Sequence, residues 1–363
     1  MLFVNQQEQV NLLTLNKMGE MKMSKIKTCV SLYSLQYEYM TKRMSLEDIF
    51  KFLSENSVEG IEVLPDQMIH GAPHPSKETL DEWHRLCDKY KLKPVIADVF
   101  LNTNLYKNRE LTKKESIDLL IEEIKLANKL GIKMIRLVSM VPAFVIEPLL
   151  PYCEEYDVKI ALEIHAGLSF DAKPTKEFID VMKRVNSPYV GLVVDTGIFC
   201  KRMPRVMENY CRELGTNQEA IDYVNRLFEQ GKDGRLLTDN NGDLIPEFKS
   251  LLKSGPDFMY GHLADGYENE PFEILDEYMP YIMHMHFKLF EMTEDGEYSM
   301  DYKGLLNYLH EKGYDGYVAT EYEGNRWTLP GEPIVEKEQV IAHQKYIRSC
   351  LEEIEASLEK VQG

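Results

Sequence analysis

The sequence predicts an α/β fold, a closed (β/α)8 TIM barrel with a helical insertion between its sixth and seventh strands. From Thr28 onward, short β-branched runs alternate with stretches of helical periodicity. Successive runs are spaced by roughly 30 to 40 residues, the usual length of one β-α unit. The last four runs place a histidine or a carboxylate at or near their C-terminal ends, where a parallel barrel builds its active site.

The predicted elements follow one another along the chain. The first four strands are expected at 29–35, 60–64, 94–100 and 134–139, with helices at 46–55, 76–90, 112–130 and 142–156. The last four strands are expected at 158–165, 189–195, 281–286 and 317–321, and a final helix at about 336–360. Ser76 suits a helix N-cap, Gly131 suits a C-cap, and Pro142 favours a helix start.

Two segments depart from this regular spacing. The stretch between Asp195 and Tyr281 is far longer than one unit needs, so residues of about 200–280 are predicted to hold an insertion with helices near 217–230 and 246–253. We expect it to cap the site or to form a partner surface; an insertion with neither role is the alternative. Residues 1–23 are expected to be a disordered or non-native tail, or else a genuine flexible arm, before a single barrel domain at 24–363.

Composition narrows the class of function. The net charge is -18 and the pI is about 5.0, which disfavours binding to a nucleic-acid backbone. The six cysteines form no CxxC pair and are typical of a reduced, cytoplasmic protein. No apolar run approaches the length of a membrane span, which predicts no membrane association. No GxGxxG motif follows a strand, so no nucleotide cofactor is expected.

The polar residues of the last four strands predict a metal site. Its expected ligands are Glu163, Asp195, His286 and Glu321. Three carboxylates and an imidazole that converge in a barrel are costly if unpaired, and one divalent cation would compensate them. Oxygen-rich ligands with one imidazole favour Mn²⁺, with Mg²⁺ or Co²⁺ as alternatives. The competing interpretation is a network of salt bridges and hydrogen bonds with Arg136, Lys288 and Arg326.

The two-residue period of a strand groups further residues with these ligands. Glu163 and His165 are expected to face the same side, as are His284 and His286. His165 is predicted to be a general base, because imidazole titrates near neutral pH. A hydrogen-bonding role behind the ligands is the alternative for His165.

Four segments carry a resemblance to a known superfamily. They are EIH at 163–165, VVDTG at 193–197, HMHFK at 284–288 and GYDGYVATEYEG at 313–324. Over roughly residues 28–350 the chain resembles the sugar phosphate isomerase/epimerase superfamily, the xylose-isomerase-like TIM barrels. Within the last motif, the spacing from Gly316 singles out Glu321.

Three further segments carry a narrower resemblance. SLYSLQYEY at 31–39, GIEVLPDQMIHGAPHPS at 60–76 and ALEIHA at 161–166 resemble the alpha subunit, the large catalytic subunit, of bacterial C-glycoside deglycosidases. This resemblance implies a lyase that cleaves the carbon–carbon bond of 3-oxo-C-glycosides, together with a small beta subunit in a hetero-oligomer. It also implies a bacterial cytoplasmic location. The insertion at 200–280 matches no motif of that family.

The implied chemistry assigns roles to several residues. The carbonyl of a 3-oxo sugar acidifies its C2–H, and a divalent metal would stabilise the resulting enolate. His165 would remove the proton, and the bond from C1 to the aglycone would then break by elimination. In the alternative, a metal-dependent ketose or sugar phosphate isomerase or 3-epimerase, Glu163 and Glu321 would be ligands and acid–base groups. The expected substrate-binding residues are Tyr33, Gln36, Glu62, Asp98, His284, Lys288, Arg326 and Trp327.

Overall fold

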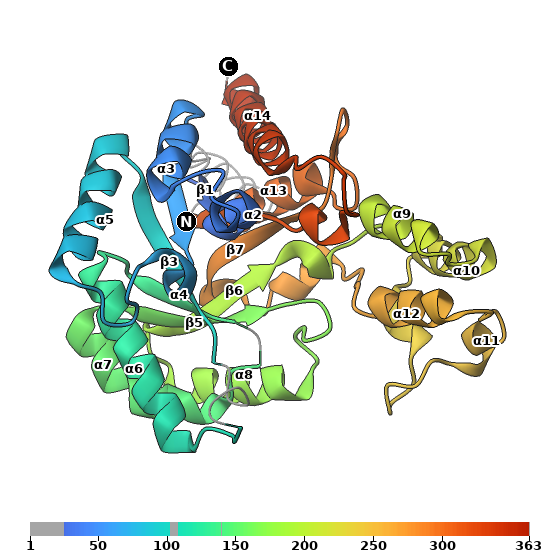
Figure 1. Ribbon diagram of the computed structural model, residues 1–363, viewed down its shortest axis with the longest axis horizontal. Helices are drawn as coiled ribbons and strands as arrows, with labels where there is room; N and C mark the ends of the chain where they lie inside the picture. The colour runs from blue at the N-terminus through green and yellow to red at the C-terminus, as the bar shows by residue number, and fades with distance from the viewer. Residues whose placement is uncertain (1–24, 102–107, 139, 363) are drawn as a thin grey trace, which may run out of the picture.

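Eight parallel strands close into a barrel in the computed structural model, which describes residues 25–101, 108–138 and 140–362 (Figure 1). Their order around the barrel is β1-β10-β7-β6-β5-β4-β3-β2, so consecutive barrel strands along the chain are neighbours in space. Helices surround the strands in Figure 1. The predicted closed barrel is therefore confirmed. The predicted tail at 1–23 lies outside the described residues.

The barrel strands lie close to the predicted positions. They are β1 (Lys27–Ser31), β2 (Gly60–Val63), β3 (Lys93–Val99), β4 (Met134–Leu137), β5 (Lys159–Ile164), β6 (Val190–Asp195), β7 (Ile282–Leu289) and β10 (Tyr317–Tyr322). A small hairpin of β8 (Met292–Thr293) and β9 (Gly296–Glu297) follows β7. The first strand is shorter than predicted, because the chain turns at Ser31 into the 3-10 helix η1 (Leu32–Leu35). Ser34 secures this turn by bonding across to the carbonyl of Thr320 and the N–H of Tyr322.

The helices that alternate with the strands also follow the sequence. They are α2 (Gln36–Met40), α3 (Leu46–Glu55), α4 (Pro65–Met68), α5 (Lys77–Tyr90), α6 (Lys113–Lys129), α7 (Ile146–Tyr156), α8 (Lys173–Val185), α13 (Tyr302–Glu311) and α14 (Glu336–Gln362). Ser76 and Thr112 cap α5 and α6, since each side chain accepts an N–H from the first turn. The helix expected from residue 142 begins as a 3-10 turn, η2 (Ala143–Val145), ahead of α7.

The barrel interior is built in layers by the two-residue period of its strands. The lower layer is apolar: Ile96, Met134, Ala161 and Val193 form one buried cluster. Two residues further along the same four strands stand Asp98, Arg136, Glu163 and Asp195, all buried. The apolar cluster therefore lies directly below a layer of charged side chains, and this charged layer lies near the C-terminal ends of the strands.

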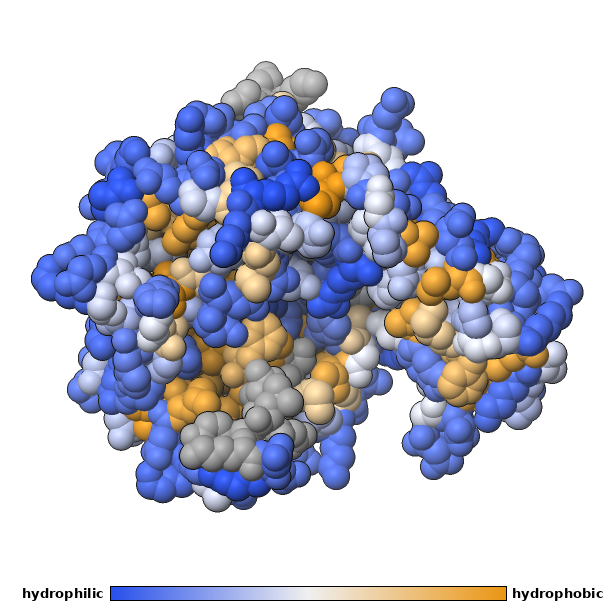
Figure 2. All heavy atoms as spheres, in the orientation of Figure 1, coloured by the Kyte–Doolittle hydropathy of each residue, from blue (hydrophilic) through white to orange (hydrophobic). Residues whose placement is uncertain are grey.

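Four helices lie between β6 and β7, and we call residues 205–264 the lobe. They are α9 (Arg205–Glu213), α10 (Gln218–Glu229), α11 (Pro246–Lys249) and α12 (Gly255–Ala264). They gather beside the barrel in Figure 1, around the buried side chains of Val224, Phe248 and Tyr260. Figure 2 shows hydrophobic side chains on the surface of the lobe. Two exposed hydrophobic residues of the lobe are Leu236 and Phe258, each 50% exposed.

Membrane-spanning helices are absent from the described part of the chain, where no helix combines sufficient length with sufficient hydrophobicity.

Glu123 on α6 provides a test of helix packing. Burial, followed by the charges of Asp66 and Glu122, raises its pKa from 4.5 to about 7. The folded state thus favours the protonated form, and its stability falls as the pH rises from 4.5 through 7. Glu123→Gln is expected to increase the free energy of unfolding at pH 8 and to leave it nearly unchanged at pH 4.5. Urea denaturation at both pH values measures this, with Glu177→Gln on α8 as an exposed control; equal gains at both pH values would contradict it.

Candidate metal centre

Four side chains converge at the C-terminal ends of β5, β6, β7 and β10. Glu163, Asp195, His286 and Glu321 each offer a ligand atom, and these atoms lie within 4.8 Å of one another. All four residues are buried, with at most 4% of their surface exposed. Register explains the convergence, because Asp195 pairs with His286 across β6 and β7. On the other side His286 pairs with Ala319, whose small side chain leaves space inside the barrel.

Two buried cations lie among these groups. Arg136 Nη1 is 2.5 Å from Glu163 Oε1 and 3.0 Å from His286 Nδ1. Lys288 Nζ is 2.8 Å from Asp195 Oδ2 and 2.5 Å from Glu321 Oε2. The salt bridges of the competing interpretation are therefore present for both residues. A metal ion would replace the contacts of Arg136 Nη1, while Arg136 Nε keeps its bond of 2.5 Å to Asp98.

These salt bridges do not balance the charge of the site. Six buried carboxylates stand around Arg136 and Lys288: Glu62, Asp98, Glu163, Asp195, Glu321 and Glu323. Two permanent cations thus face six acids, and burial raises the pKa of two of these acids, Asp98 and Asp195. A further cation in the site would favour the ionised form of both. Three carboxylates with one imidazole are also a suitable ligand set for a divalent ion. The residues present therefore fit a metal ion.

The carboxylates of the site differ in how far nearby positive charges offset the cost of burying their negative charge. Burial, the largest single effect, would raise the pKa of Glu163 and of Glu321, but the neighbouring positive charges together lower both values. Arg136 makes the largest of these contributions for Glu163, and Lys288 for Glu321. For Asp195, burial dominates over the opposing charge of Lys288, and its pKa is raised. Asp195 is thus the ligand whose negative charge is least compensated by the protein. A divalent cation would relieve that cost.

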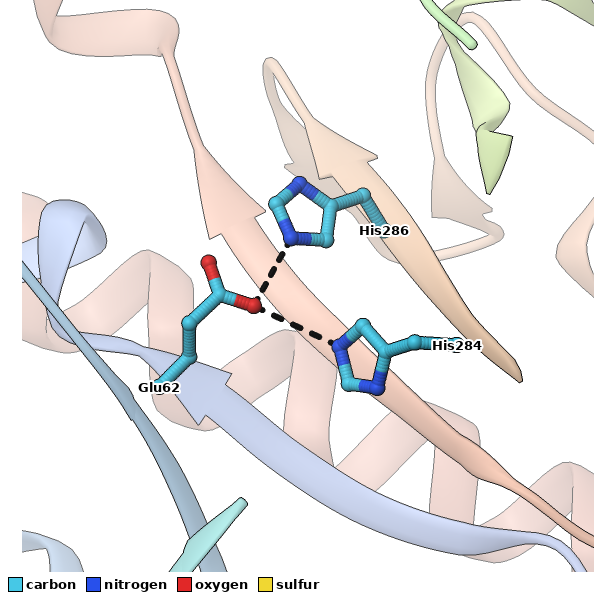
Figure 3. Close-up of side chains that lie close together, drawn as sticks. All are labelled: Glu62, His284 and His286. Carbon is cyan, nitrogen blue, oxygen red and sulfur yellow. Dashed lines mark hydrogen bonds and ion pairs between the residues drawn. The ribbon is translucent and has the colours of Figure 1, made fainter. Parts of the chain in front are cut away.

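Glu62 contacts the imidazole rings of both His286 and His284 (Figure 3) and orients the ring of His286 through a hydrogen bond. Its Oε2 is 2.8 Å from His286 Nε2 and 3.3 Å from His284 Nε2. When Nε2–H donates to Glu62, Nδ1 keeps its lone pair, and this atom is 3.3 Å from Glu321 Oε2. Glu62, His284 and His286 also satisfy the spacing of a metal site on their own. We interpret them as a support for the ligand, because Glu62 accepts a bond from His286 within this set.

The predicted substrate-binding residues divide into two groups. Glu62, Asp98, His284 and Lys288 are at most 2% exposed, and each faces another charged or imidazole group of the site. The other four lie nearer the rim. Arg326 Nε donates to the Tyr33 hydroxyl, Gln36 donates to Gln67, and Trp327 makes an edge contact with Tyr210 of the lobe. Tyr33 and Gln36 follow β1 rather than ending it, as the shorter strand requires.

His165 follows β5 directly and is only partly buried. Its Nδ1 is 2.7 Å from the carbonyl oxygen of Ala166, which can only accept a hydrogen bond. The proton of the neutral ring is therefore on Nδ1, and Nε2 has a free lone pair. His165 lies outside the four-ligand set, two residues beyond the ligand Glu163 in the chain. This arrangement is what a general base beside the ligands needs.

Two residues have contacts around the site that the sequence did not predict. Arg136 was expected only as a salt-bridge partner, although one arginine inside the apolar run MIRL is a signal of a buried charge network. Glu268, between the lobe and β7, contacts the loop after His165 through a bond to Gly167. No motif surrounds Glu268, so only the tertiary structure identifies it.

Residues 50–224 match the protein-family model described as "Xylose isomerase-like TIM barrel". This part of the chain is thus similar to that family, as predicted, and the closed barrel agrees with the family's fold. A solved structure, titled as the IOLI protein with a binding zinc atom, has a TM-score of 0.54 and 15% sequence identity. The match covers 90% of this chain and 99% of that one. At this identity the likeness shows the fold alone.

Two curated relatives of this barrel carry more specific names. One is the 3'-dehydrocarminate deglycosidase alpha subunit of a Microbacterium species, 25% identical over 90% of this chain and 96% of the relative. The other is a C-glycoside deglycosidase alpha subunit of Arthrobacter globiformis, 25% identical over 86% of this chain and 88% of the relative. Both relatives are thus named as alpha subunits of deglycosidases.

Proposed function

We propose that this chain is the catalytic alpha subunit of a metal-dependent lyase that cleaves the C-glycosidic bond of 3-oxo-C-glycosides. The observation that carries the proposal is the arrangement at the end of β5. Glu163 belongs to the four-ligand set, and His165, two residues later in the chain, has its Nδ1 on the carbonyl of Ala166, which leaves a lone pair on Nε2. A proposed metal ligand and a proposed base thus lie two residues apart at the end of β5. The names of the relatives suggest deglycosylation as the reaction for this pair.

The proposed reaction is an elimination. His165 takes the C2 proton of the 3-oxo sugar, and the electrons of that C–H bond form the enolate with its charge on the 3-oxo oxygen. The bond from C1 to the aglycone then breaks, its electron pair remains with the aglycone carbon, and that carbon takes up a proton. A C1–C2 double bond remains in the 3-oxo sugar. The metal ion, when bound, stabilises the negative charge that develops on the sugar oxygen.

The proposed ligands are Glu163, Asp195, His286 and Glu321, and Mn²⁺ is the proposed ion, because oxygen atoms dominate the set. Mg²⁺ and Co²⁺ are the alternatives. The fold neighbour titled with a zinc atom adds Zn²⁺ to the ions that a test should include. Metal analysis of protein purified without added metal identifies the ion.

The proposed partner is a small beta subunit, supported by the word "alpha" in the names of both relatives. Expressed alone, the chain should be poorly soluble or inactive toward a 3-oxo-C-glucoside. Co-expression with a small protein encoded beside it should restore solubility and turnover. Product formation by chromatography measures the effect, with an unrelated small protein as the control. A stable chain that cleaves the substrate unaided would contradict this prediction.

An isomerase or 3-epimerase of ketoses is the second candidate, and the matched family model favours it at the level of the fold. In that reaction Glu163 and Glu321 would move a proton on either side of a ketose carbon. Incubation of the purified single chain with free ketoses in D₂O separates the two candidates. Deuterium incorporation and epimerised sugar would support the second candidate. The absence of both, together with cleavage of a 3-oxo-C-glucoside by the chain co-expressed with its proposed partner, would support the first.

A further inference from the structure

Glu268 connects the segment after the lobe to the loop that follows β5. It lies beyond the end of α12 and is 1% exposed. Its Oε1 accepts the backbone N–H of Gly167 at 2.7 Å. Its carbonyl accepts the N–H of Cys200 at 2.8 Å, so its backbone is also attached to the chain that leaves β6. An acid this buried needs partners, and a main partner here is one peptide group of the loop that carries His165.

That peptide group belongs to a tight turn. The N–H of Leu168 donates to the carbonyl of His165 at 2.8 Å, which closes the turn. Gly167 has φ +83°, a conformation that glycine adopts without strain. In a turn closed this way, a positive φ at the third residue indicates a type II turn. In that turn type the orientation of the peptide between the two central residues, Ala166 and Gly167, is the defining feature.

The two sides of this peptide have different partners. A peptide bond is planar, and in its trans form the carbonyl and the N–H point in opposite directions. The carbonyl of Ala166 lies 2.7 Å from His165 Nδ1. The N–H of Gly167, on the other side, is bound by Glu268. The orientation that satisfies Glu268 is therefore the orientation that presents an acceptor to His165.

We propose that Glu268 is a positioning residue for His165, because it holds the Ala166–Gly167 peptide in the orientation that keeps the imidazole proton on Nδ1. Nε2 then keeps its lone pair. This inference rests on the proposed role of His165 as the base. It gives the long segment between β6 and β7 a function in catalysis beyond that of a cover or a partner surface.

Arg235 keeps Glu268 in place. This arginine lies in η4 (Gly234–Leu237) of the lobe, and its Nη1 is 3.6 Å from Glu268 Oε2. The same nitrogen is 2.8 Å from Glu270 Oε1 and 3.9 Å from Asp171 Oδ1 in the loop after β5. Arg235 thus joins the lobe, the segment of Glu268 and the loop of His165. Glu270 shares this network but has no bond to the turn, which makes it a matched control.

The test compares two substitutions of similar volume. Glu268→Gln keeps an acceptor oxygen for the N–H of Gly167, whereas Glu268→Met fills the space without one. Glu270→Met is the control that loses an acid of the same network. The full chain, with its partner subunit and diamagnetic Mg²⁺, is labelled with ¹⁵N-histidine. The signal of His165 among the nine histidines is assigned by its loss in His165→Ala. The ¹⁵N shifts report which ring nitrogen carries the proton.

The expected result is a change of tautomer in one variant only. Glu268→Met should shift a substantial part of the His165 population to the Nε2–H tautomer and lower kcat by about tenfold, the usual weight of one hydrogen bond, with KM nearly unchanged. Glu268→Gln and Glu270→Met should keep the Nδ1–H tautomer and most of kcat. An unchanged tautomer in a folded Glu268→Met variant would overturn the proposal, whatever its activity.

Two further outcomes are decisive. If Glu268→Met does not fold, the parent protein still tests the inference, since the Gly167 amide must exchange slowly with solvent and His165 must be the Nδ1–H tautomer. Rapid exchange or the other tautomer would overturn it. Full activity of His165→Ala would instead refute the proposed base, and the tautomer measurement would still decide whether Glu268 holds the turn.

Discussion

Asp195→Asn should empty the metal centre and abolish turnover. Asp195 is fully buried within the four-ligand set, and an amide supplies neither the charge nor the affinity of a carboxylate. The parent protein should contain about one divalent ion per chain, and EDTA should remove the ion and the activity together. Metal analysis by mass spectrometry and turnover of a 3-oxo-C-glucoside measure both effects. Glu163→Gln should have the same result.

The fold should survive this substitution, because the site contains more acids than cations. Lys288 still has Glu321 at 2.5 Å and Glu323 at 3.2 Å after Asp195 loses its charge. Thermal unfolding of the metal-free variant should therefore occur at or above the temperature of the metal-free parent. Glu323→Gln is the control for charge alone: it contacts Lys288 but offers no ligand, and should retain the metal. Full metal content and full activity in both Asp195→Asn and Glu163→Gln would refute the site.

His165→Ala should reduce turnover by about 10² to 10⁴, the usual contribution of a general acid or base, without loss of the metal. The reason is that Nε2 of this ring keeps its lone pair, whereas His165 is not one of the four ligands. Single-turnover rates of the variant and the parent give the size of the effect. Metal content and thermal stability, measured on the same samples, should be nearly unchanged.

Histidine substitution elsewhere gives the control. His84 is an exposed residue of α5 that bonds to the carbonyl of Lys129, and His84→Ala should keep the parent rate. Loss of metal in His165→Ala would make His165 a ligand. An unchanged rate would assign the proton transfer to a carboxylate, with Glu321 as the first to test, and would favour the epimerase mechanism.

Much of the barrel could be predicted from local signals. Buried parallel strands are short, β-branched and bounded by turn residues, and helix caps such as Ser76 and Thr112 act within one turn of chain. The two-residue period then predicted which polar residues face inward, and the structure brings Glu163, Asp195, His286 and Glu321 within reach of one another. Such information is local, because it depends on periodicity and on neighbours in sequence.

The partners of those residues depend on the closure of the barrel. Glu62 and His286 are 224 positions apart, yet they meet because β2 and β7 both face the same interior. Arg136 contacts Glu163 from the neighbouring strand and His286 from across the barrel. No periodicity in the sequence encodes a distance between opposite walls, so the support of the ligand and the charge balance are visible only in three dimensions.

The sequence by itself determined the fold class, the strands that form the site and the types of residue at their ends, because each of these follows from local patterns of hydrophobicity. Only the tertiary structure decided which nitrogen of His286 and of His165 faces a hydrogen-bond acceptor, since each depends on where its partner lies in space. It also brought Glu268 to the turn at Gly167, 101 positions away in sequence. A bond of that kind requires the chain to fold back on itself, and no local preference of either residue predicts it.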